Sequence, residues 1–173
     1  MRWTLVVGAA LMLAGCAATM ADKEPLSAEA TLKDKDGKQV GSATLIQTPE
    51  GVRMAITGYR LPPGPHGLHI HAVGACQPPE FTSAGAHFNP GGKKHGSQSP
   101  DGPHAGDLPN LVVAANGEGG IDTVNKLVTL APGPPSLFAA SGTSIVIHAT
   151  ADDLKTDPTG NSGGRIACGV ITR

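Results

Sequence analysis

Residues 67–71 read Gly-Leu-His-Ile-His, residues 83–90 read Ser-Ala-Gly-Ala-His-Phe-Asn-Pro, and residues 104–107 read His-Ala-Gly-Asp. Together with His95, which lies between the last two motifs, this stretch holds five of the chain's seven histidines. Imidazole is a common ligand of copper and zinc in proteins. So many imidazoles within one short stretch predict a metal centre.

The spacing of the first two histidines predicts a strand. His69 and His71 are two residues apart, and alternate residues of a β-strand point to the same face. Their rings would project side by side, which suits the tetragonal nitrogen coordination that copper favours. His148 lies far downstream in an apolar run and is a sixth candidate ligand.

The later candidates belong to a loop. His95, His104 and Asp107 lie in a stretch rich in Gly, Pro, Ser and Lys, which does not favour regular structure. Such a loop can keep its shape by wrapping a metal, and imidazoles with a carboxylate suit tetrahedral zinc. His87 lies between the two groups, so it could bind either metal or both.

The composition favours one all-β domain. The 173 residues include 24 glycines and 15 prolines but only five aromatic residues. Many turns and few bulky rings are typical of a β-sandwich or barrel, and the length suffices for a sizeable core. The formal net charge is −1, which argues against nucleic-acid binding because that requires a basic surface.

Alternating apolar residues and turn motifs predict eight short strands and no helix. The connection Leu61–His66 contains three prolines and should not form regular structure. Gln77–Asn110 and Asp152–Gly164 lack a sustained period and are predicted to be long loops, which compact domains tolerate when the loops are functional. The expected strands span residues 27–33, 40–47, 52–58, 67–73, 111–115, 121–130, 143–149 and 166–172.

The amino terminus has the features of an export signal. Arg2 precedes the apolar run Leu5–Leu13, which is too short to span a bilayer. The run ends in Leu-Ala-Gly-Cys at residues 13–16, which resembles a bacterial lipobox. Residues 1–15 would then be a signal peptide and Cys16 a lipidated first residue. The alternative is an ordinary secretory signal that is cleaved a few residues later.

The cysteines fit this interpretation. Three cysteines are an odd number for an exported chain. If Cys16 carries lipid, Cys76 and Cys168 are left and can form one disulfide. Residues 16–26 are small and polar and are interpreted as a flexible tether to a domain over residues 27–173.

Four motifs, taken in order, resemble the copper/zinc superoxide dismutases in their exported bacterial form. The similarity extends from Ser27 to the carboxyl terminus. It implies an eight-stranded Greek-key β-barrel whose two long loops hold both metals outside the barrel. The motifs are residues 67–71, 83–90 and 104–107 and the stretch Gly-Asn-Ser-Gly-Gly-Arg-Ile-Ala-Cys-Gly at 160–169.

The resemblance also implies a role for each candidate ligand. The implied copper ligands are His69, His71, His87 and His148. The implied zinc ligands are His87, His95, His104 and Asp107. As a bridge between the metals, His87 would be an imidazolate that takes up a proton during turnover, because two nearby cations favour the anionic ring.

Two further side chains match residues of the family's site. Arg165 matches the arginine that docks the anionic substrate beside copper, so Arg165 and His87 are the predicted catalytic residues. Asp152 matches a carboxylate that links the copper ligand His69 to the zinc ligand His95.

Two features lie outside the family pattern. Pro158 stands where many relatives have a lysine, so attraction of the substrate would depend on other charges, for which Lys93, Lys94 and Lys155 are candidates. His66 has no role in the family, and its Pro-Gly surroundings predict a solvated side chain.

The resemblance implies an enzyme that contains copper and zinc and converts superoxide to dioxygen and hydrogen peroxide. As a lipoprotein anchored to a membrane through Cys16, it would act in the bacterial periplasm as an antioxidant of the cell envelope. The alternative is an envelope lipoprotein that binds copper and zinc without turnover; the complete ligand set and Arg165 favour the enzyme. The sequence is compatible with a monomer or a homodimer.

Overall fold

The computed structural model describes residues 24–173. The expected signal peptide and Cys16 lie outside the described residues. Within residues 24–173, no helix has the length and apolar character needed to cross a membrane.

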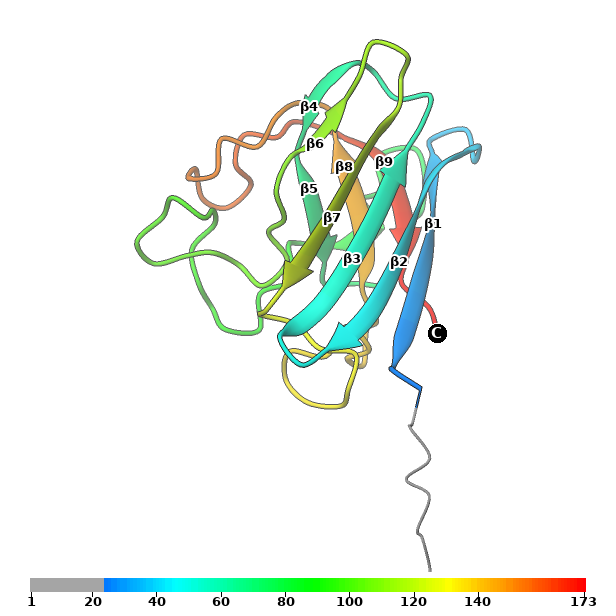
Figure 1. The fold of residues 1–173 in the computed structure, drawn as a ribbon. Helices are drawn as coiled ribbons and strands as arrows, with labels where there is room; N and C mark the ends of the chain where they lie inside the picture. Colours follow the sequence, from blue (N-terminus) through cyan, green and yellow to red (C-terminus); the bar gives the residue numbers. More distant parts are fainter. Residues whose placement is uncertain (1–23) are drawn as a thin grey trace, which may run out of the picture.

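One antiparallel sheet contains all nine strands of the described chain (Figure 1). Its strand order is β4-β6-β7-β3-β2-β1-β9-β8-β5, and the sheet curls into a nearly closed barrel. The elements are β1 (Ser27–Asp34), β2 (Gln39–Thr48), β3 (Gly51–Gly58), β4 (Gly64–His66), β5 (Leu68–His71), the short 3-10 helix η1 (Thr82–Ala84), β6 (Leu111–Val113), β7 (Gly119–Asn125), β8 (Ser144–His148) and β9 (Arg165–Val170).

The two ends of the sheet meet at Gly67. β4 and β5 occupy opposite ends of the strand order, yet only Gly67 separates them in the chain. Residues 64–71 therefore form one bent strand, whose first half pairs with β6 and whose second half pairs with β8. The bend has no room for a side chain, because a Cβ on Gly67 would lie 2.6 Å from the Cβ of Ser162.

The all-β fold is confirmed, with one correction to the strands. The sequence predicts no regular structure for Leu61–His66, and this is wrong for Gly64–His66, which forms β4. Proline is compatible with this position because β4 is an edge strand at one end of the sheet, where Pro65 needs no partner on its free side. The count of nine strands, against the eight expected, comes from this extra strand.

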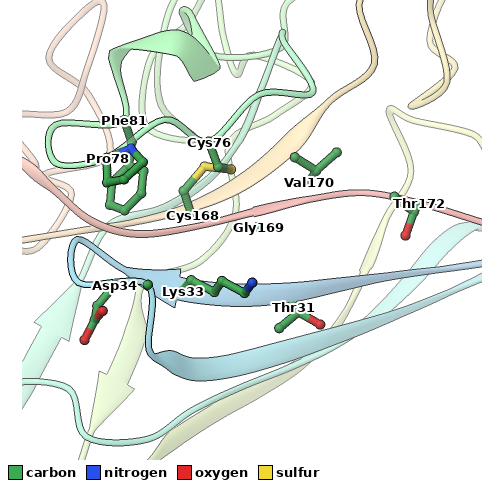
Figure 2. A pocket seen from close by; sticks show the side chains of 11 residues that line it. Thr31, Lys33, Asp34, Cys76, Pro78, Phe81, Cys168, Gly169, Val170 and Thr172 are labelled. Carbon is green, nitrogen blue, oxygen red and sulfur yellow. A yellow bond between two sulfur atoms is a disulfide. The ribbon is translucent and has the colours of Figure 1, made fainter.

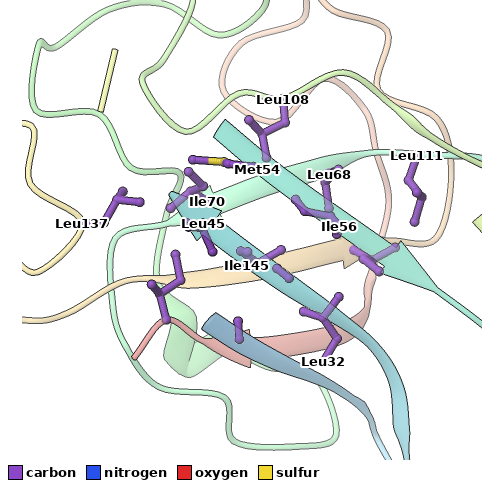
Figure 3. Close-up of a cluster of buried hydrophobic side chains, with 14 of the residues drawn as sticks. Leu32, Leu45, Met54, Ile56, Leu68, Ile70, Leu108, Leu111, Leu137 and Ile145 are labelled. Carbon is purple, nitrogen blue, oxygen red and sulfur yellow. The ribbon is translucent and has the colours of Figure 1, made fainter. Parts of the chain in front are cut away.

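The barrel interior is filled by every second residue of its strands. Buried and exposed positions alternate along β1, β2 and β3, as the period of two in a strand requires. Figure 3 shows Leu32, Leu45, Met54, Ile56 and Ile145 gathered between the strands, and all five are fully buried. This aliphatic core makes the barrel a rigid support for the loops outside it.

The bent strand presents different residues to its two sides. Leu68 and Ile70 belong to the barrel core, so His69 and His71 point outward. The outward face is nevertheless buried, because the loop between β5 and β6 covers it and forms β-bridges from Asp107 to His69 and from His87 to His71. The candidate ligands on β5 are therefore enclosed between barrel and loop.

Two neighbouring residues of β2 test this arrangement. Leu45→Ala removes a fully buried side chain and should lower the free energy of unfolding by about 2–5 kcal/mol. Ile46→Ala truncates an outward side chain that is 37% exposed and should cost less than about 1 kcal/mol. Urea unfolding of the metal-free protein measures both values, and equal losses would contradict the inward and outward assignment.

Candidate metal centre

All seven candidate ligands lie together on one side of the barrel. The six histidine rings are buried, and neighbouring ring centroids are as close as 3.9 Å. The ligands are His69 and His71 on β5, His148 at the end of β8, and His87, His95, His104 and Asp107 in the loop between β5 and β6.

The first ligand set consists of His69, His71, His87 and His148, whose donor atoms all lie within 4.8 Å of one another. Hydrogen bonds define the proton on two of these rings. The Nδ1 of His71 lies 2.9 Å from the carbonyl oxygen of Gly85, and the Nδ1 of His148 lies 3.2 Å from that of Gly163. A carbonyl only accepts, so Nδ1 carries the proton in both rings and Nε2 presents a lone pair.

These two lone pairs face each other. The Nε2 atoms of His71 and His148 are 3.4 Å apart. Burial lowers the pKa of His71 to about 2 and that of His148 to about 3, so both rings are neutral at pH 7. Two lone pairs at this distance repel each other, and a shared cation would remove the repulsion.

The other two rings of the first set also present unpaired nitrogens. The Nε2 of His69 donates to the Oδ2 of Asp152 over 2.6 Å, and among residues 24–173 its Nδ1 has no hydrogen-bond partner. The Nε2 of His87 likewise has no partner in this part of the chain. Buried polar atoms without partners are rare and costly, so four unprotonated imidazole nitrogens in one place fit a copper ion.

The second ligand set has the dimensions of a zinc site. The Oδ1 of Asp107 lies 3.1, 3.0 and 3.4 Å from the Nδ1 atoms of His87, His95 and His104, respectively. The Nδ1 atoms of His87 and His104 are 3.4 Å apart. Ligands bound to tetrahedral zinc at about 2.0 Å are separated by about 3.3 Å, so these four separations are already close to the spacing that zinc requires.

His69 is close to both sets. Proximity alone groups His69 with His87, His95 and Asp107 and leaves His104 out. The contacts favour His104 as the fourth member, because its Nδ1 lies near both the Asp107 carboxylate and the His87 ring.

Asp152 connects the two sets. Its buried carboxylate accepts hydrogen bonds from the Nε2 of His69 and, over 3.0 Å, from the Nε2 of His95. Burial alone would raise the pKa of Asp152, but these hydrogen bonds outweigh it and lower the pKa to about 2. The carboxylate is therefore ionised, and it orients one ring in each set so that the Nδ1 atom faces the centre.

Comparison with known proteins identifies the family. Residues 39–171 match the copper/zinc superoxide dismutase family. The chain belongs to this family. The sequence is similar to that of superoxide dismutase [Cu-Zn] 2 of Aquifex aeolicus, with 48% identity over 150 residues, 86% of this chain and 88% of the relative. It is also similar to superoxide dismutase [Cu-Zn] of Caulobacter vibrioides, with 43% identity over 170 residues, 96% of this chain and 98% of the relative.

The fold is also similar to that of solved structures. The crystal structure of a SOD-like protein from Bacillus subtilis superposes with a TM-score of 0.79 at 39% identity, covering 82% of this chain and 96% of the other. Copper/zinc superoxide dismutases are oxidoreductases that use copper and zinc and act on superoxide. The family's two metals agree with the two ligand sets found here.

Arg165 lies at the start of β9, beside the first ligand set. Its guanidinium donates to the carbonyl oxygens of Phe81 over 2.5 Å and Gly85 over 2.6 Å. The Gly85 oxygen also accepts the hydrogen bond from His71. One carbonyl therefore fixes both the arginine and a ligand of the first set.

The predicted disulfide between Cys76 and Cys168 is present, with a Cα–Cα distance of 5.6 Å. Figure 2 shows it between Pro78 and Phe81 on one side and β9 on the other. Cys168 lies on β9 with Arg165, and Cys76 lies shortly before the carbonyl groups that accept hydrogen bonds from Arg165. The disulfide therefore keeps these acceptors close to the arginine.

A cavity of about 490 Å³ opens above the first ligand set. Its lining includes His71, His87 and His148 together with Arg165, while the other wall comes from the loop between β8 and β9. Among the described residues that line it, Arg165 is the one permanently charged side chain.

The three candidate lysines do not line this cavity. The Lys94 ammonium lies 3.2 Å from the Asp157 carboxylate, which offsets its charge. Pro158 itself is part of the cavity wall, so an uncharged ring occupies the place for which the family resemblance implies a lysine.

His66 corrects another expectation. The sequence predicts a solvated side chain, which is wrong: the ring is 2% exposed. Its Nδ1 lies 2.7 Å from the carbonyl oxygen of His148, and its Nε2 lies 2.7 Å from that of Pro62. The alternation of the strand would have predicted this burial. His66, Leu68 and Ile70 are spaced two residues apart along the bent strand, and all three are buried.

The metal-free protein should lose stability as the pH falls below neutrality. Burial lowers the pKa of His69 to about 4, and the pKa values of His71 and His148 are lower still. Below about pH 6.5 the unfolded chain therefore binds protons that the folded protein does not, so the free energy of unfolding falls. Each unit of pKa difference corresponds to about 1.4 kcal/mol.

Denaturant unfolding of the metal-free protein between about pH 7 and pH 4 measures this dependence. Replacing His71 by glutamine, which does not titrate, should make the slope shallower. A free energy of unfolding that stays constant over this range would contradict the neutral, buried state of the rings.

Proposed function

We propose that this chain dismutes superoxide at the first ligand set, while the second set is structural. The reaction converts two superoxide anions and two protons into dioxygen and hydrogen peroxide. One observation carries the assignment of roles: the cavity reaches His71, His87 and His148 but not the remaining ligands of the second set. Catalytic metal sites keep an open position, whereas structural zinc sites are closed.

The first set, with four imidazole nitrogens, would hold copper, and the second set, with three imidazoles and one carboxylate, would hold zinc. Bound copper supplies the exchange of one electron with each superoxide, whereas zinc has no redox chemistry.

His87 is proposed to be shared between the sets and to carry a proton. Its Nδ1 lies among the second-set atoms, and its Nε2 is an unpaired nitrogen of the first set. The residue also lines the cavity. With Nδ1 held in the second set, Nε2 can take a proton from solvent and pass it to the reduced substrate, and the second proton comes from water.

Arg165 is proposed to dock the substrate. A guanidinium has five N–H donors, and hydrogen bonds to Phe81 and Gly85 use only some of them. The remaining donors are available to an anion in the cavity. Because those carbonyls fix the side chain, the positive charge is positioned before the substrate arrives.

Arg165→Ala should lower kcat/KM of the copper- and zinc-loaded protein by about tenfold or more, since a charge that focuses an anion on a cleft raises association rates by about 10–10³-fold. The wild-type rate should fall with increasing ionic strength, and the variant's rate should depend on it less. Arg53→Ala is the matched control, because it removes an equal charge from an exposed pair with Asp122 on β3 and β7.

The same measurement separates the two candidate functions. Stoichiometric binding of copper and zinc with no turnover above that of free copper would overturn the enzymatic proposal. That outcome would favour an envelope lipoprotein that binds both metals without catalysis.

We further propose that the chain is exported and anchored through lipid on Cys16. The support is the lipobox-like end of residues 1–15 and the polar tether up to residue 26. A periplasmic enzyme held at a bacterial membrane would remove superoxide that arises outside the cytoplasm. β1 begins at Ser27, directly after the proposed tether.

Labelling with radioactive palmitate in a bacterial host tests the anchor. The full chain should incorporate label and sediment with membranes, whereas Cys16→Ser should lose the label. Cys76→Ser is the control, because it removes a cysteine of the disulfide, away from the proposed anchor, and should leave the label in place. Unchanged labelling of Cys16→Ser would contradict the proposal.

A further inference from the structure

The second ligand set contains one histidine whose outer nitrogen has no assigned partner. His87 directs its Nε2 to the first set, and His95 donates its Nε2–H to Asp152 over 3.0 Å. The Nδ1 of His104 belongs to the second set, so its Nε2 carries the proton when the ring binds a metal. Histidines that bind metals usually donate this second N–H to a carboxylate, a carbonyl or water.

The acceptor in position is Asp157, in the loop between β8 and β9. Its Oδ1 lies 3.8 Å from the Nε2 of His104. The same oxygen accepts the backbone N–H of His95 over 2.7 Å, and Oδ2 accepts from the Lys94 ammonium over 3.2 Å. One carboxylate thus contacts two histidines of the second set from outside.

The loop of Asp157 is closely fitted to the loop of these histidines. The Gln98 N–H donates to the carbonyl oxygen of Leu154 over 2.9 Å. A Cβ on Gly96 would clash with that oxygen, and a Cβ on Gly160 would lie 2.6 Å from the Nε2 of His95. The two backbones are therefore in direct contact, and Asp157 has little freedom to move away from His95 and His104.

We propose that Asp157 is a positioning residue of the zinc site. It fixes the backbone of His95, and in the zinc-bound protein it accepts the Nε2–H of His104, which requires the present 3.8 Å separation to shorten to about 2.9 Å. The inference rests on the proposed function, which assigns these histidines to zinc. Pro158, the next residue, lines the cavity of the first set, so the same carboxylate also holds that wall against the zinc loop.

Zinc affinity, measured by competition with a chromophoric chelator, tests the proposal without any turnover. Asp157→Ala should bind zinc about 10–100-fold more weakly, the usual effect of removing a hydrogen-bond partner from a ligand. Asp157→Asn should bind zinc about two- to tenfold more weakly, because its amide oxygen can still accept from both histidines but lacks the negative charge that strengthens these hydrogen bonds. Cobalt placed in the zinc site should show altered absorption bands in Asp157→Ala and near-normal bands in Asp157→Asn.

Lys94→Gln is the matched control. It removes the exposed ion pair with Asp157 and leaves the carboxylate, and such pairs contribute about 0–1 kcal/mol, so zinc affinity should change less than about fivefold. Wild-type affinity in Asp157→Ala, or an equal loss in Lys94→Gln, would overturn the proposal. If metal-free Asp157→Ala does not fold, Asp157→Asn decides: a measurable loss of affinity supports the role, and wild-type affinity overturns it.

The zinc-affinity test of Asp157 does not depend on whether the protein dismutes superoxide. A protein that binds zinc through His104 and Asp107 but does not dismute superoxide would contradict the proposed function and leave the role of Asp157 intact. If His104→Ala leaves zinc affinity unchanged, the assignment of the second set is wrong, and the role of Asp157 fails with it.

Discussion

Repulsion between buried lone pairs is the constraint on which this site depends. Neutral imidazoles converge on one region outside the barrel, and hydrogen bonds to carbonyls and to Asp152 turn their unprotonated nitrogens toward each other. Burial prevents the rings from relieving the repulsion by protonation, as the lowered pKa values of His71 and His148 show. Only cations can neutralise such an arrangement, so folding and disulfide formation prepare a site that favours metal over protons.

The strands of the barrel position some of these rings, and a loop outside the barrel positions the others. Two strands supply His69, His71 and His148 from a rigid aliphatic core, while the loop between β5 and β6 supplies the rest. The disulfide and the Arg165 guanidinium attach the first part of that loop to β9. The second set is enclosed by backbone contacts, and the first set stays open to solvent through the cavity. This difference in access is the basis for proposing a catalytic role for the first set and a structural role for the second.

Most of the fold was predictable because its signals are local. Alternating apolar residues identified the long hairpins, and the His-x-His spacing placed His69 and His71 on one strand face. β4 and the buried position of His66 were missed because prolines suggested an irregular connection, whereas the end of a sheet accepts them. The contacts of Asp157 could not be predicted either, since they depend on how two loops fit together in space.

The bent strand Gly64–His71 gives the core and the metal site a single register. Leu68 and Ile70 face the core while His69 and His71 face the loops. Because side chains alternate, inserting or deleting one residue there would exchange the two faces, placing imidazoles in the barrel and aliphatic chains among the ligands. Insertions and deletions in this segment would therefore disrupt the core and the metal site together. Substitutions that keep its length can alter the packing of the core or the metal ligands separately.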